Sequence, residues 1–254
     1  MSQRVKAIES QLGRVLLRRG KPVTATESGQ AVVRLARQVE LLQRDARAAL
    51  QPAEGELTSI ALAVNGDSLA TWILPALARL SAVHPLVFDL HREDQAHSAE
   101  LLRQGAVMAA VTSEAAPVQG CVVTPLARMR YRPMATAAFR RRWFPHGVTA
   151  EAISAAPVVE FDRKDDLQRD FVRSVHPGAR PPQHFVPASA EFAAAVALGL
   201  GWGMVPAMQA EEHPGLEPLA DGVDVPLYWQ QWALDSPALA LVAEALREAA
   251  RSVH

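Results

Sequence analysis

The sequence is short of the residues on which disulfide and metal frameworks depend. Its 254 residues contain one cysteine, Cys121, which excludes an internal disulfide framework and a cysteine-based zinc cluster. We interpret Cys121 as a small buried apolar residue. The histidines have no metal-ligand spacing, so no metal and no other cofactor is expected.

Long apolar runs are absent as well. No uninterrupted apolar stretch reaches membrane length, and no apolar signal-peptide region follows the polar first residues. We therefore expect a cytoplasmic protein without membrane contact. The net charge of −1 excludes a chain that is a polycation throughout, but residues 1–50 carry ten arginines and lysines against four acidic residues. Such a local excess is what contact with phosphates requires.

The first fifty residues predict a helix, a basic hairpin and a long second helix. Apolar residues at helical spacing predict a helix over residues 2–12, which Gly13 ends. A Gly-Lys-Pro turn between two short strand-like segments, residues 15–19 and 23–25, predicts a basic hairpin over residues 15–25. Thr26 then follows as the N-cap of a long helix predicted over residues 27–50.

The predicted long helix carries an apolar seam. Its apolar residues recur at alternating steps of three and four, which is typical of a helix that pairs with another helix. The seam consists of Val32, Leu35, Val39, Leu42, Ala46 and Ala49. We therefore expect self-association, as a homodimer or a homotetramer.

A polar-basic helix, a basic hairpin and a pairing helix, in this order, are typical of a winged helix-turn-helix protein that presents a helix to the major groove. Base edges are within reach of Ser2, Gln3 and Arg4, and the hairpin cations suit phosphates. The candidate DNA-binding residues are Ser2, Gln3, Arg4, Lys6, Arg18, Arg19 and Lys21. The alternative is a solvated amphipathic helix beside a surface hairpin, because basic faces are often only solvent faces.

A polar break with proline and glycine at residues 51–56 predicts a domain boundary. Beyond it, strands predicted over residues 57–64, 85–92 and 107–112 alternate with helices, which indicates an α/β fold with a parallel sheet. The pattern restarts over residues 128–225. The expected architecture is therefore two α/β lobes joined by crossing strands, as in periplasmic binding proteins.

This pattern leads to a predicted division of the chain. We expect a partial winged helix-turn-helix at residues 1–27, a dimerising linker helix at 28–50, and an effector-binding domain at 57–254, with lobe I at 57–128 and 227–254 and lobe II at 129–226. The other predicted elements are helices over residues 69–83, 167–174, 192–198 and 237–252 and strands over residues 130–135, 156–161, 184–187, 199–206 and 228–233.

Side chains at the carboxyl ends of strands converge on the cleft between such lobes. The candidate effector-binding residues are Asn65, Asp67, Ser68, Asp94, Gln95, His97, Thr112, Asp165, Ser189, Trp202 and Asp235. Carboxylates, hydroxyls and helix N-termini together suit a ligand with amino groups and a carboxylate. We expect the helix N-termini after Asp67 and near Ser189 to hold the carboxylate, and Asp67 or Asp94 to bind an amine. The alternative is that Asp67 and Ser189 are N-caps and that Asp94 and His97 lie in a solvated loop.

Residues 66–69 also spell the signature of the GDSL hydrolases, in which Ser68 would be the nucleophile and Asp94 and His97 its partners. That family carries its Asp-x-x-His near the C-terminus and adds glycine and asparagine oxyanion blocks, which this sequence lacks. A short motif by itself is weak evidence. We therefore expect that the protein is not an enzyme.

Several segments of the sequence resemble the LysR-type transcriptional regulators, in particular the ArgP/LysG-like branch that controls lysine and arginine export. The similar segments are residues 2–9, 12–16, 21–29, 65–72, 93–97, 199–206 and 228–237, so the resemblance covers essentially the whole chain. It implies promoter DNA as a partner, a basic amino acid as the effector, an amino-acid exporter gene as the target, and possible contact with RNA polymerase.

The chain departs from this family at its first residue. Family members begin earlier, with a first helix and most of the turn, and often have valine where this chain has Met1. A GTG valine codon read as a start would produce such a chain. Without that scaffold we expect Val5, Ile8 and Leu12 to be exposed or loosely packed. The alternative function is then a stand-alone amino-acid sensor that does not bind DNA by itself.

Overall fold

The computed structural model describes residues 3–50, 57–93 and 98–253, and its contacts divide the chain into two compact units. Unit 1 comprises Met1–Val64, Leu77–Thr124 and Tyr228–Ala245; unit 2 comprises Asn65–Ala76, Pro125–Leu227 and Leu246–His254. Helices and strands occur in both units, as the predicted α/β fold requires. No described helix is both long and apolar enough to cross a membrane. The domain and lobe boundaries given above stay a prediction.

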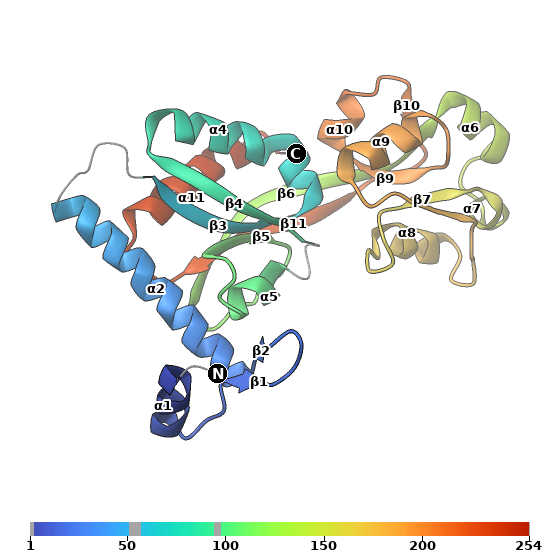
Figure 1. Ribbon diagram of the computed structural model, residues 1–254. Helices are drawn as coiled ribbons and strands as arrows, with labels where there is room; N and C mark the ends of the chain where they lie inside the picture. The colour runs from blue at the N-terminus through green and yellow to red at the C-terminus, as the bar shows by residue number, and fades with distance from the viewer. Residues whose placement is uncertain (1–2, 51–56, 94–97, 254) are drawn as a thin grey trace. The chain divides into compact units, whose positions relative to one another are not determined.

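The first elements of unit 1 lie where the sequence predicts them (Figure 1): α1 (Gln3–Leu12), β1 (Leu17–Arg18), β2 (Thr24–Ala25) and α2 (Glu27–Leu50). The two short strands pair antiparallel. The backbone N–H of Gly29 donates to Thr26 Oγ1 at 3.0 Å, which confirms Thr26 as the N-cap of α2.

Glu9 ties α1 to the hairpin. Its carboxylate oxygen Oε1 accepts hydrogen bonds from the backbone N–H groups of Leu16 at 2.7 Å and Leu17 at 3.3 Å. No residue of α1 is buried, and Ile8 and Leu12 are 40% and 52% exposed. The expectation of an exposed or loosely packed apolar face on α1 is therefore confirmed.

Helix α2 packs against the turn that follows α5 (Ser98–Arg103). Gly105 in this turn has φ +68, and a Cβ at this position would lie 2.6 Å from the Cα of Arg34, so glycine lets the two backbones approach. The guanidinium of Arg37 donates to the carbonyl oxygen of Gly105. Leu41 is fully buried on this side of the helix, whereas Leu35, Val39 and Leu42 from the predicted seam stay exposed.

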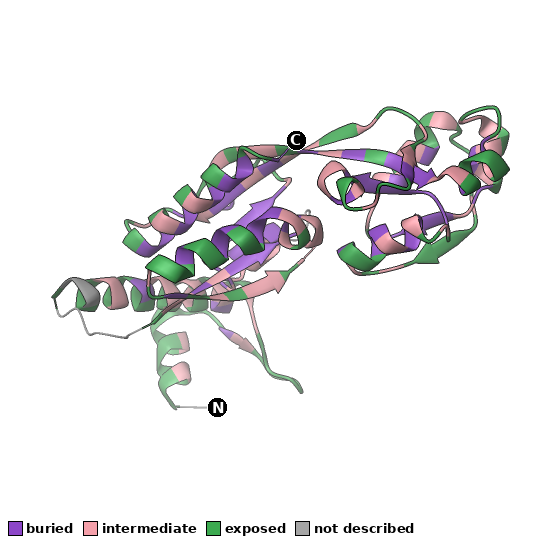
Figure 2. Cartoon of the chain, turned by 90° about the horizontal axis from the view of Figure 1, so that it is seen from above, coloured by how far each residue is buried: buried purple, intermediate pink, exposed green. Residues whose placement is uncertain are grey.

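The sheet of unit 1 is built on β3 (Thr58–Val64), which pairs in parallel with β4 (Leu86–Arg92) and β5 (Ala109–Thr112). This confirms the predicted parallel sheet. The long strand β11 (Val223–Trp232) pairs antiparallel with β5. Figure 2 shows buried residues concentrated on the central strands, β3 and β5, while the outer faces of helices α4 (Leu74–Val83) and α11 (Pro237–Ala250) are exposed.

In unit 2, β6 (Cys121–Thr136) pairs antiparallel with β9 (Gly203–Pro206) and β10 (Leu216–Pro218), and β7 (Val158–Glu160) pairs in parallel with β8 (Gln183–Phe185). Its shorter elements are α3 (Gly66–Ser68), the π-helical turn η1 (Leu69–Ile73), α6 (Ala137–Trp143), α7 (Ala150–Ala155), α8 (Leu167–Val175), α9 (Ser189–Ala197) and α10 (Ala207–Glu211).

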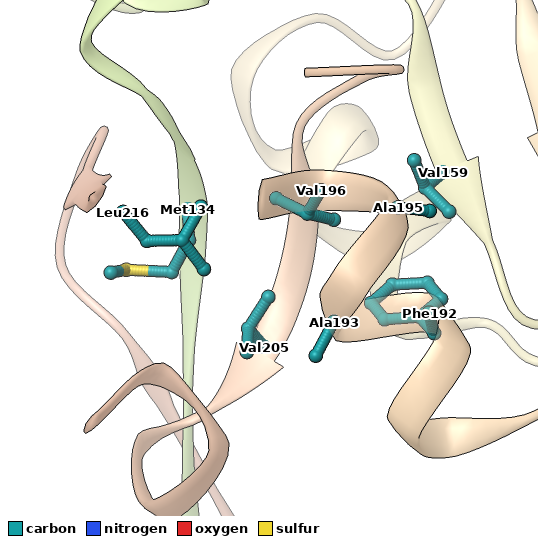
Figure 3. Close-up of a cluster of buried hydrophobic side chains, with 8 residues drawn as sticks. All are labelled: Met134, Val159, Phe192, Ala193, Ala195, Val196, Val205 and Leu216. Atoms are coloured by element: carbon teal, nitrogen blue, oxygen red, sulfur yellow. The ribbon is translucent and has the colours of Figure 1, made fainter. Parts of the chain in front are cut away.

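Helix α9 forms the centre of a buried cluster in unit 2. Figure 3 shows Phe192, Ala195 and Val196 of this helix next to side chains from strands β6, β7, β9 and β10. The backbone of β9 lies against α9, because a Cβ on Gly203 would lie 2.8 Å from the ring of Phe192. The absence of a side chain at Gly203 therefore lets the backbone of β9 approach the ring of Phe192. This packing fixes the N-terminus of α9, where Ser189 lies.

Several predicted element boundaries are wrong. The helix expected from residue 69 begins at Gly66, and its next five residues are the π-helical turn rather than regular α-helix. The strand expected over residues 130–135 is the end of a longer strand that begins at Cys121. Short helices α6, α7 and α10 were not predicted, since five to seven residues give too little periodicity.

The end of α9 has a clear local cause. Gly199 has φ +83 and its N–H donates to the carbonyl of Val196, which is a glycine helix terminus. The strand expected from residue 199 therefore begins only at Gly203. The helix expected from residue 192 begins at Ser189.

Candidate ligand-binding site

The carboxylate of Asp67 lies at the centre of a polar cluster within unit 2. The hydroxyl of Tyr131 donates to Asp67 Oδ2 at 2.6 Å, and the hydroxyl of Ser189 donates to Asp67 Oδ1 at 2.6 Å. The amide Nε2 of Gln209 in turn donates to Ser189 Oγ at 2.8 Å. The side chains come from α3, β6, α9 and α10, so four separate segments build the cluster.

The local backbone explains why the carboxylate of Asp67 is available to accept hydrogen bonds from distant residues. Asn65 is extended, with φ −74 and ψ 153, and α3 begins immediately after it without a side-chain cap. The carboxylate of Asp67 is bound by Tyr131 and Ser189 rather than by the first turn of its own helix. The alternative that Asp67 and Ser189 are N-caps is wrong: Asn65 precedes the first helix, and Ala188 precedes the second without a side-chain cap.

Buried polar atoms of residues close to Asp67 in the sequence, and of Gln209, lack partners in the part of the chain that the structure describes. They are both side-chain atoms of Asn65, the hydroxyl of Ser68, Nε1 of Trp72 and Oε1 of Gln209. Asn65, Ser68, Trp72 and Gln209 are each less than 5% exposed. An unpaired buried polar group costs about 1–3 kcal/mol, and most buried polar groups in proteins have a partner. Donors and acceptors beside a carboxylate suit a small zwitterionic ligand.

Burial raises the pKa of the Asp67 carboxyl group and outweighs the hydrogen bonds from Ser189 and Tyr131, which lower it. Its surroundings thus disfavour the charged form of this group. A cationic group bound beside it would supply the missing compensation, because an opposite charge favours ionisation.

The structure brings together some of the predicted effector-binding residues but not all. Asn65, Asp67, Ser68 and Ser189 lie in or beside the cluster. Asp165 instead accepts from the N–H of Leu167 at 3.0 Å in the turn that precedes α8. Trp202 is fully buried, with its ring edge-on to Phe171 at 5.5 Å, and belongs to the core of unit 2.

The remaining predicted effector-binding residues belong to unit 1 or lie outside the described residues. Thr112 is buried and its hydroxyl accepts from the N–H of Glu114 at 3.1 Å, while Asp235 is exposed. Asp94, Gln95 and His97 are outside the described residues.

Tyr131 and Gln209 were missed by the sequence analysis. Tyr131 lies on a strand that was predicted, but strand periodicity does not show that its hydroxyl meets a carboxylate 64 positions away. Gln209 lies on α10, which was not predicted. Both residues could be identified only from the tertiary fold.

The basic residues of α1 and the hairpin are exposed. Gln3, Arg4 and Lys6 lie on α1, and Arg18, Arg19 and Lys21 on the hairpin, while Ser2 is outside the described range. Throughout residues 3–50, 57–93 and 98–253, no group of histidine, cysteine, aspartate and glutamate side chains is arranged to hold a metal ion.

Comparison with known proteins places these features in a family. Residues 53–251 match the LysR substrate binding domain. The HTH-type transcriptional regulator LysG of Mycobacterium tuberculosis is 44% identical over 265 residues, covering 100% of this chain and 85% of the relative. The lysine export transcriptional regulatory protein LysG of Corynebacterium efficiens is 41% identical over 263 residues, covering 99% of this chain and 88% of that protein.

Solved structures agree with this. The crystal structure of ArgP from Mycobacterium tuberculosis has a TM-score of 0.92 at 42% identity and covers 99% of this chain and 87% of its own. Full-length LysG from Corynebacterium glutamicum with bound effector Arg has a TM-score of 0.85 at 38% identity, covering 98% and 87%. These relatives are named as regulators and not as enzymes, which agrees with the rejection of a GDSL hydrolase. The chain therefore belongs to the LysR family and is a transcriptional regulator of the LysG/ArgP type.

Proposed function

We propose that this regulator binds promoter DNA and that a basic amino acid bound at the Asp67 cluster controls its output at an amino-acid exporter gene. The observation that carries the proposal is the desolvated carboxylate of Asp67, surrounded by buried polar atoms without partners among the described residues. The arginine bound to LysG of Corynebacterium glutamicum and the lysine-export name of the Corynebacterium efficiens relative support the choice of ligand and target.

Each part of an amino acid has a counterpart in the cluster. The carboxylate of Asp67 binds the α-ammonium group, which carries donors only. The hydroxyl of Ser68 and Nδ2 of Asn65 are donors for the α-carboxylate, next to the backbone N–H groups at the start of the helix that follows Asn65. The hydroxyl of Ser189 and its partner Gln209 hold Asp67 in place.

The DNA-binding part of the proposal rests on α1 and the hairpin. The exposed cations Arg18, Arg19 and Lys21 bind phosphates, and Gln3 and Arg4 on α1 face base edges. The exposed seam residues Leu35, Val39 and Leu42 of α2 pair with a second copy, giving a dimer or tetramer with paired DNA-binding heads. Effector binding then shifts the population of conformations in which both heads fit their half-sites and present the promoter to RNA polymerase.

A second function is favoured by one observation. The helix proposed to enter the major groove buries none of its residues and leaves Ile8 and Leu12 exposed. A DNA-binding segment in which α1 is held only by the hairpin would bind DNA weakly by itself. The chain would then be an amino-acid sensor that acts through pairing of α2 with another regulator.

One experiment separates the two functions. Gel shifts of the chain with the promoter of a neighbouring exporter gene are made with and without L-lysine and L-arginine, beside unrelated DNA of equal length. Calorimetry measures amino-acid binding in parallel. Specific, ligand-dependent shifts support the regulator, and ligand binding without any shift supports the sensor. Absence of both would overturn the proposed site as well.

A further inference from the structure

A second acidic group in unit 2 is buried without a compensating cation. Glu160 ends β7 and is 1% exposed. Its Oε1 accepts from the amide Nε2 of Gln183 at 3.2 Å, but its Oε2 has no hydrogen-bond partner within the described residues. Burial raises the pKa of this carboxyl group, against smaller lowering effects from Gln183 and Arg169. Glu160 was not among the residues predicted from the sequence.

The first turn of α8 lies near Glu160 and adds another acceptor. Asp165, Asp166 and Arg169 of this region act electrostatically on the Glu160 carboxyl group. Gln168, between them in the chain, is 1% exposed and its Oε1 also lacks a partner among the described residues. Two unpaired acceptors in one region therefore call for a ligand that carries donors.

The nearest basic side chain does not fill this role. The guanidinium of Arg169 donates to the carbonyl oxygens of Asp165 and Arg163, each at 3.0 Å, and forms an ion pair with Asp166 at 3.1 Å. No ion pair joins Glu160 to a cation in the described chain, and a buried carboxylate without one is costly. Ammonium and guanidinium groups carry donors and no acceptor, which matches two free acceptor oxygens.

The backbone connects this region to the Asp67 cluster. The carbonyl oxygen of Glu160 accepts from the N–H of Val186 at 2.9 Å, and Ser189, which binds Asp67, follows three residues later. Three residues span about 10 Å at most. The two desolvated carboxyl groups thus belong to neighbouring parts of unit 2, as two cations of one small molecule require.

We propose that Glu160, assisted by Gln168, binds the cationic group at the end of the effector's side chain. This inference rests on the proposed function, in which Asp67 binds the α-ammonium group of the same amino acid. Glu160 is then the residue that distinguishes a basic amino acid from a neutral one of equal shape. Guanidinium offers a planar fork of donors that can meet both acceptor oxygens at once.

The test uses pairs of ligands of similar shape, of which one carries the cationic group and the other does not. Isothermal titration calorimetry of the full chain compares L-arginine with L-citrulline and L-lysine with L-norleucine. We expect the wild type to prefer the charged member of each pair by at least about tenfold, because an unpaired buried carboxylate penalises the neutral ligand. In Glu160→Gln the preference should fall to near unity, mainly through weaker binding of arginine and lysine.

The matched control is Glu212→Gln, which removes the same charge from an exposed position of unit 2 and should leave the preference unchanged. Equal binding of arginine and citrulline by the wild type overturns the inference. This result needs no variant, so the inference can be tested even if the Glu160→Gln protein folds poorly. An unchanged preference in folded Glu160→Gln also overturns it and leaves the proposed function standing. A wild type that binds neither arginine nor lysine overturns both.

Discussion

The hydroxyl of Ser189 donates to the carboxylate of Asp67 at 2.6 Å, although the two residues are 122 positions apart in the chain. One residue belongs to the first turn of α3 and the other to the first turn of α9, so the bond joins two helix N-termini. The first N–H groups of a helix have no partner within that helix, and the carboxyl group of Asp67 lies at both helix starts. This combination of features suits an amino acid with both of its charged groups.

Substitution of Asp67 by asparagine should separate binding from stability. The asparagine side chain keeps an acceptor for Tyr131 and removes a desolvated charge, so we expect little change in the melting temperature. Binding of L-arginine should weaken by at least about tenfold, since a charge-assisted hydrogen bond is lost. Calorimetry and thermal denaturation measure the two effects. Asp221→Asn, at an exposed position of unit 2, is the control, and equal affinities of the two variants would contradict the role of Asp67.

The same residue gives a pH dependence of stability with a defined sign. Because the folded-state pKa of Asp67 lies above its ordinary value of 3.8, the folded protein holds this proton more tightly than the unfolded chain. The free energy of unfolding of the wild type should therefore fall relative to Asp67→Asn as pH rises from about 3.8 through the raised pKa. Urea denaturation of both proteins over this range measures the difference. A difference that is constant or changes in the opposite direction would show that burial does not dominate.

Gly105 should be intolerant of a side chain. A Cβ there would meet the Arg34 backbone at 2.6 Å, and φ is +68, so Gly105→Ala combines a clash with backbone strain. We expect a loss of about 2–4 kcal/mol in the free energy of unfolding. Gly147→Ala is the matched control, because its φ is +83 but no atom lies within 4 Å of the added Cβ. Equal losses in both variants would mean that α2 does not pack against this turn.

The exposed seam of α2 should control self-association. Leu35 and Val39 are 59% and 44% exposed, and we expect Leu35→Lys with Val39→Lys to convert dimers or tetramers to monomers by placing charges in the paired surface. Sedimentation velocity measures the change. Leu198→Lys alters a residue of unit 2 that is 80% exposed and serves as the control. An unchanged sedimentation coefficient in the double variant would place the interface elsewhere.

The hairpin cations should contribute through phosphate contacts. Arg18→Gln and Arg19→Gln should weaken binding to specific and unrelated DNA alike, because phosphates carry no sequence information. The slope of log affinity against log salt concentration is negative, and each lost contact should reduce its magnitude by about 0.9. Fluorescence anisotropy at several salt concentrations measures this, and Arg141→Gln on the exposed face of α6 is the control. If the variants change the preference for specific over unrelated DNA but not the salt slope, these arginines contact base edges rather than phosphates.

Elements governed by short-range rules could be predicted from the sequence. Helix α2 begins and ends where its apolar spacing and the Thr26 cap predict, and β3, β4 and β5 form the expected parallel sheet. Helix periodicity, capping and strand alternation depend on neighbours in the chain, so a single sequence contains them. The resemblance to LysR-type regulators added the family, which the comparisons confirm.

The candidate site was only partly predictable, because its members come from distant segments. Asp67 and Ser189 could be named from their places after a strand and before a helix. The partners Tyr131 and Gln209 and the buried state of Glu160 depend on how β6, β7 and α10 pack, which no local pattern encodes. The sequence by itself thus determined most of the elements and the basic character of the first fifty residues, and it predicts a ligand with amino groups and a carboxylate. Only the tertiary structure decided which carboxylates lose their water, since desolvation is set by the atoms of every segment packed around them.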